Sequence, residues 1–72
     1  MKKVTQANLS IGNNLFVKIE IKSNNNNFFF YVNEAMIFFG SLHEIKTIYD
    51  NWLYASEERL FFAIKTLNGA RK

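Results

Sequence analysis

Residues 15–32, LFVKIEIKSNNNNFFFYV, contain both strands and the turn of a β-hairpin, and this hairpin organises the rest of the fold. From residue 15 to residue 22, aliphatic residues occupy every odd position, and three of the four even positions carry a charge. This period-two alternation is typical of a half-buried antiparallel strand. Asparagine tolerates left-handed backbone, so the run at 24–27 predicts a turn. Residues 28–32 then form the returning strand.

The register of this hairpin decides which aromatic side chains are buried, because a slip of one residue exchanges the two faces. With a loop over 24–27, Ser23 faces Phe28, and the core face takes the aliphatic residues together with Phe28, Phe30 and Val32. A five-residue loop reverses the faces. We favour the first register, because it buries three apolar residues of the second strand and leaves a tyrosine hydroxyl near water. The opposite face then carries Phe16, Lys18, Glu20, Lys22, Phe29 and Tyr31.

The segments on either side leave two alternatives open. Residues 1–14 are either a frayed tail or a first edge strand that ends at the turn-forming GNN of 12–14. Residues 34–39, EAMIFF, form either a third strand after a tight turn at Asn33 and Glu34 or a short helix between Asn33 and Gly40. We favour the strand, which adds Met36 and Phe38 to the face that carries Phe29. The sheet thus has two to four strands.

Two helices are expected after the sheet. Ser41 and Glu44 form a capping box, and apolar residues then recur at helical spacing up to residue 53. A second helix begins after Ser56 and is expected to stop at Asn68–Gly69, with the basic pair at 71–72 beyond its end. Its expected buried stripe is Leu60, Phe61, Ala63, Ile64 and Leu67, and Phe62 points the opposite way. The prediction is an α+β fold, a small antiparallel sheet followed by two helices packed on one face.

Composition limits the function classes. A chain of 72 residues is a single domain, residues 1–72, with a small core. It has no cysteine and one histidine, so neither a disulfide nor a metal site is expected. The apolar runs are too short to cross a bilayer, and no apolar signal segment follows the first lysines. We therefore expect a cytoplasmic protein with an intact start and no membrane partner.

Enzymatic activity is not expected. The only histidine and the only aspartate, His43 and Asp50, fall on the polar face of the first helix with no cleft predicted around them. The three glycines are isolated, which argues against a phosphate-binding loop. No catalytic residue, cofactor or small-molecule substrate is predicted.

Nucleic-acid binding is the alternative hypothesis. Lys18 and Lys22 alternate with Phe29 and Tyr31 on one sheet face, and single-stranded nucleic acids are bound by such mixtures of cations and stacking rings. The first helix is a second candidate surface. The net charge of +3 permits this interaction without demanding it.

Protein binding is the leading hypothesis. Two helices can cover only one face of the sheet, and large apolar patches left on a surface usually mark interfaces. The predicted partner-binding residues are Phe16, Phe29, Tyr31, Met36, Phe38 and Phe62. We expect a non-enzymatic protein that acts by stoichiometric binding, either as a homodimer or docked on a larger complex. By its size and by elimination of other classes, a phage or mobile-element inhibitor of a host defence complex, in the manner of anti-CRISPR proteins, is the expected biology.

Overall fold

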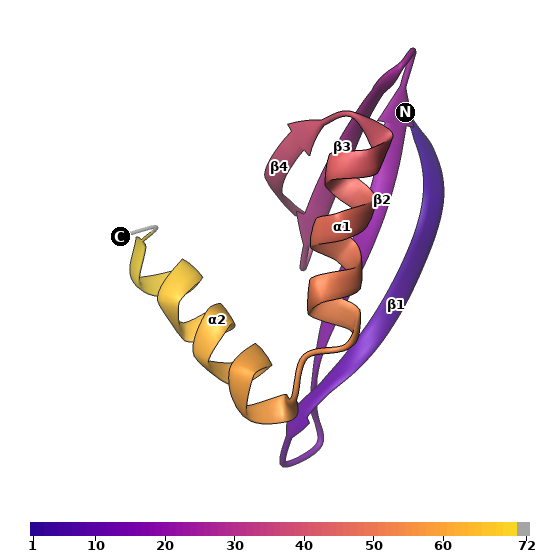
Figure 1. Cartoon of the computed structure of the whole chain (residues 1–72). Coiled ribbons are helices and arrows are strands. Elements are labelled where there is room, and N and C mark those ends of the chain that lie inside the picture. The colour runs from indigo at the N-terminus through magenta and orange to yellow at the C-terminus, as the bar shows by residue number, and fades with distance from the viewer. Residues whose placement is uncertain (71–72) are drawn as a thin grey trace.

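The hairpin of residues 15–32 forms the middle of a four-stranded antiparallel sheet in the computed structural model, which describes residues 1–70 (Figure 1). The strands follow one another in space in their chain order, and two helices come after them. The predicted α+β fold is therefore confirmed. The elements are β1 (Lys2–Gly12), β2 (Leu15–Asn24), β3 (Asn27–Val32), β4 (Ala35–Gly40), α1 (Leu42–Leu53) and α2 (Glu57–Ala70).

The register between β2 and β3 is the one that the hydrophobic pattern predicts. Ser23 pairs with Phe28, and Ile21 pairs with Phe30. The ladder continues one pair further than expected, to Asn24 and Asn27. Only two residues are then left for the turn between the strands.

Asparagine residues with left-handed backbone make all three turns of the sheet. Asn13 and Asn14 have φ angles of 49° and 61°, and Asn25 has a φ of 50°. In the last turn, Asn33 has a φ of 48° and Glu34 a φ of 70°. Asparagine adopts this region more readily than most residues, whereas glutamate does so at a cost. The asparagine-rich composition thus has a direct structural use.

The two segments whose structure the sequence left undecided, 1–14 and 34–39, both form strands. Residues 2–12 form an edge strand, and residues 35–40 form β4 after the tight turn at Asn33 and Glu34. The ladder between β3 and β4 contains one irregularity: Tyr31 pairs with Met36, whereas Phe30 pairs with Phe38. Ile37 is therefore an extra residue, a β-bulge.

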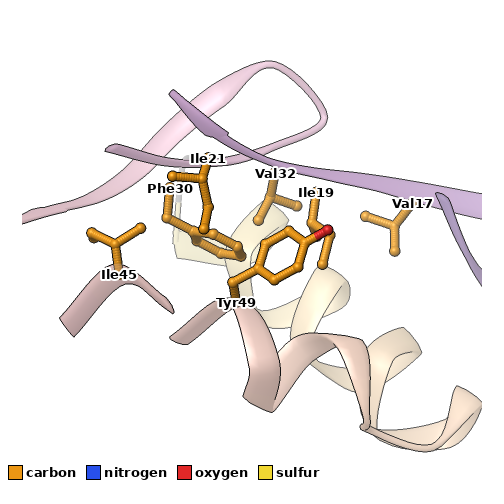
Figure 2. Close-up of a cluster of buried hydrophobic side chains, with 7 residues drawn as sticks. All are labelled: Val17, Ile19, Ile21, Phe30, Val32, Ile45 and Tyr49. Atoms are coloured by element: carbon orange, nitrogen blue, oxygen red, sulfur yellow. The ribbon is translucent and has the colours of Figure 1, made fainter. Parts of the chain in front are cut away.

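The core lies between the sheet and α1. Figure 2 shows side chains of β2 and β3 pointing toward Ile45 and Tyr49 of α1. Phe30 is at the centre, fully buried, with an edge-on contact to Tyr49 at 6.5 Å between ring centroids and a tilted contact to Trp52 at 5.8 Å. The predicted capping box starts this helix: the backbone N–H of Glu44 donates to Ser41 Oγ, and that of Ser41 donates to Glu44 Oε1.

Helix α2 packs on the same side of the sheet, against β1, and diverges from α1 (Figure 1). Leu60 is buried, and Ile64 and Leu67 pack against the core as predicted. Two predictions about this helix are wrong. Phe61 remains half exposed, because the diverging helix buries a narrower stripe than its sequence pattern suggests. The helix also continues past Gly69 to Ala70, since one glycine near a helix end costs only about 1 kcal/mol.

The expected basic pair beyond α2, at 71–72, lies outside the described residues. Among the helices of residues 1–70, none has the length and apolar character needed to cross a membrane.

Candidate protein-binding surface

The sheet face turned away from the helices is the surface of interest, and we call it the open face. Strand pairing places one row of residues from each strand on it. In residues 1–70, the core and both helices lie against the other face. The open face consists of Lys3, Gln6, Asn8 and Ser10 of β1, Phe16, Lys18, Glu20 and Lys22 of β2, Phe29 and Tyr31 of β3, and Met36 and Phe39 of β4.

A buried carboxylate lies in the middle of the open face. Glu20 is only 2% exposed, although it occupies a polar position of an alternating strand. Lys3 Nζ lies 3.5 Å from its Oε2, and Lys18 Nζ lies 3.6 Å from its Oε1. Oε1 has no hydrogen-bond partner among the described residues. A buried charge is tolerated when opposite charges surround it, as these two ammonium groups do.

Lys18 is shared between two carboxylates. Its Nζ also lies 3.3 Å from Glu34 Oε1, in the turn before β4. The hydrogen bond to Glu34 is the largest reason that the pKa of Lys18 is raised; burial is the second-largest effect and opposes it, and the negative charges of Glu20 and Glu34 raise the pKa further. The positive charge of Lys18 is thus balanced by two carboxylates of the same chain, those of Glu20 and Glu34.

The second lysine of this strand is engaged as well. Lys22 Nζ lies 4.3 Å from the centre of the Tyr31 ring, a cation–π contact. The Tyr31 hydroxyl donates to the sulfur of Met1, at 3.4 Å. The polar side chains at the centre of the open face are thus held in place by contacts within the chain itself.

The β4 side of the open face is apolar and exposed. Phe29 and Phe39 pack together with ring centroids 6.5 Å apart, yet Phe39 is 71% exposed and Met36 is 49% exposed. We call Phe29, Tyr31, Met36 and Phe39 the aromatic cluster. It is bordered by the charged centre around Glu20 and by the free edge of β4. An apolar centre with a polar rim on one side is the usual anatomy of a protein interface.

The bulge at Ile37 corrects one predicted site residue. Uninterrupted pairing from the Asn33–Glu34 turn would have set Phe38 opposite Phe29. The extra residue moves Phe39 to that position and pairs Phe38 with Phe30, on the face that carries the helices. Phe38 is therefore not part of the open face, although it is half exposed at the sheet edge.

The other predicted residues are distributed over the molecule. Phe29, Tyr31 and Met36 come together as expected. Phe16 is on the open face, but it pairs with Ser10 near the first turn. It lies in the part of β2 that is not paired with β3, and so apart from the other three residues. Phe62 is 70% exposed on α2, away from the open face. Phe39 is a site residue that the sequence did not predict, because the adjacent Phe38 and Phe39 give no local signal of which one a bulge would place on the open face.

The residues proposed for nucleic-acid binding share the same face. Lys18 and Lys22 are both held in contacts within the sheet, and a phosphate would compete with Glu20 and Glu34 for Lys18. Within residues 1–70, no group of three or more histidine, aspartate or glutamate side chains is placed to hold a metal ion.

Comparison of the chain with protein-family models, with curated proteins and with solved structures finds no match.

Proposed function

We propose that the protein is a non-enzymatic binding protein, which uses the aromatic cluster to dock stoichiometrically on a partner protein. The supporting observation is that Phe39 is 71% exposed while its ring packs on Phe29, on a sheet face that neither helix contacts. In a folded chain with a small core, an exposed phenylalanine ring that packs on a half-buried one favours an interface. Aromatic residues and methionine are also enriched in interface centres.

Charge supports a protein partner over nucleic acid. The lysines nearest the cluster are neutralised by Glu20 and Glu34 or held over Tyr31. Nucleic-acid binding draws its affinity from phosphates that meet free cations. That the partner belongs to a host defence complex, which the chain would inhibit, is a prediction from size and elimination alone.

Affinity capture from cells that encode the chain tests the proposal. Wild-type protein should retain a partner protein at a fixed ratio, after nuclease treatment and with little change between low and high salt. Phe39→Lys should lose that partner, because it places a charge in the centre of the contact. Phe62→Lys is the matched control, since it introduces the same change at an equally exposed phenylalanine on α2. Equal capture by both variants, or recovery of nucleic acid alone, would refute the proposal.

A further inference from the structure

The free edge of β4 lies beside the aromatic cluster and has no strand neighbour among residues 1–70. An edge strand exposes unpaired backbone N–H and C=O groups, and proteins commonly protect such edges with charged residues. From Ala35 to Leu42 this chain carries no charge, and Phe38 and Phe39 are both substantially exposed. This edge therefore lacks the usual charged protection.

The other edge of the sheet is different. Strand β1 carries Lys2 and Lys3, and its ladder with β2 has two register shifts. Charged side chains and bulges both discourage pairing with another strand. Strand β4 has one bulge and no charge of its own.

We propose that β4 pairs with β4 of a second copy of this chain, and that two sheets join edge to edge as a symmetric dimer. The dimer does not depend on the proposed function. Only the role of the joined aromatic clusters, binding a partner protein, rests on that function. A strand edge is self-complementary under a two-fold axis, so every contact is made twice. The uncharged sequence also lets two copies meet without like-charge repulsion, although each chain has a net charge of +3.

Pairing of this kind has a geometric consequence for the open face. Antiparallel pairing of two identical edges requires a two-fold axis perpendicular to the sheet, so both open faces point to the same side. The two aromatic clusters then lie next to each other across the axis. A partner protein would meet one apolar surface of twice the size.

The exposed area sets the expected strength. Aromatic side chains bury roughly 150–250 Å² each when fully covered. At the exposures of Met36, Phe38 and Phe39, the three together offer about 300 Å² of side-chain surface per copy. Stable interfaces bury about 800 Å² per partner. Backbone pairing adds to the side-chain area, but we expect a dimer that forms and dissociates with concentration.

Sedimentation of the purified chain alone over a wide concentration range tests this inference. The weight-average mass should rise from 8.5 kDa toward twice that value. Phe38→Lys, which puts a charge on the edge but not on the open face, should weaken association at least about tenfold. Phe62→Lys should associate like the wild type. A mass that stays at 8.5 kDa throughout, or equal association of both variants, would overturn the proposal.

Hydrogen–deuterium exchange at low and high concentration locates the contact independently of any substitution, so the test holds even if a variant fails to fold. Amides of Ala35–Gly40 should gain protection as the concentration rises, whereas those of Lys2–Gly12 should not. Protection of β1 or of a helix instead would overturn edge pairing through β4. Such an outcome would leave the proposed function standing, because that function depends on capture of a partner that Phe39→Lys loses.

Discussion

Phe30→Ala and Phe29→Ala make the same chemical change at neighbouring residues and should differ sharply in their effect on stability. Phe30 is fully buried against Tyr49 and Trp52. Replacing a core phenylalanine with alanine typically costs about 3–5 kcal/mol of unfolding free energy. At about 0.05–0.15 kcal/mol per residue, a domain of this length has roughly 4–11 kcal/mol in total. Phe30→Ala should therefore remove a large share of the domain's unfolding free energy, roughly a quarter of it at the least.

Phe29→Ala should be far milder. Phe29 is half-buried on the open face, and its main aromatic contact is with Phe39, at 6.5 Å. Such a pair contributes about 0.5–1.5 kcal/mol beyond the area it buries. We expect a loss of about 1–2 kcal/mol in all.

Urea denaturation followed by far-ultraviolet circular dichroism measures both variants. Dichroism is preferable to fluorescence of Trp52, because Trp52 lies 5.8 Å from the ring that one variant removes. The protein should be dilute enough to stay monomeric. Equal losses, or a larger loss for Phe29→Ala, would refute the assignment of the two faces.

Three further predictions concern the start of α1 and the turn between β3 and β4. Ser41→Ala removes the hydroxyl that caps α1 and should lower the unfolding free energy by about 1 kcal/mol in urea denaturation, whereas Ser56→Ala tests the same change at the start of α2. The backbone N–H of Ser41 lowers the pKa of Glu44, so this carboxylate contributes stability above its unfolded pKa of 4.5 and loses it as the pH falls through its lower folded value. The urea midpoint of the wild type should therefore fall more steeply than that of Glu44→Gln below about pH 4.5, and parallel curves would contradict the capping box. Glu34→Gly removes the strain of left-handed backbone at a φ of 70° and should raise the unfolding free energy by up to about 1 kcal/mol, measured by the same denaturation. A lower unfolding free energy would mean that the contact of Glu34 with Lys18 outweighs the backbone strain.

The sequence predicted the hairpin and its faces because the information is local. Alternation over residues 15–22 and the asparagine run permit one register that buries three apolar residues, and this register is present. The capping box of Ser41 and Glu44 is equally local. Both features depend only on residues close together in the chain.

The candidate surface was predictable only in part, for a physical reason. Ile37, Phe38 and Phe39 are all large and apolar, so their order does not reveal which of them a bulge makes the extra residue. The burial of Glu20 depends on Lys3, which reaches it from β1, and the sequence left that segment open between a tail and a strand. A charged residue at an alternating position is usually solvated, and the nearby Lys18 alone does not indicate that the carboxylate is buried.

Site-specific photo-crosslinking shows whether the aromatic cluster contacts a partner protein. A photoreactive phenylalanine analogue is placed at position 39 or, as the control, at position 62, and the chain is irradiated in cells that encode it. We expect one dominant adduct with a second protein from position 39 and none of that adduct from position 62. Adducts from position 62 alone, with nucleic acid alone, or with the chain itself alone would contradict it.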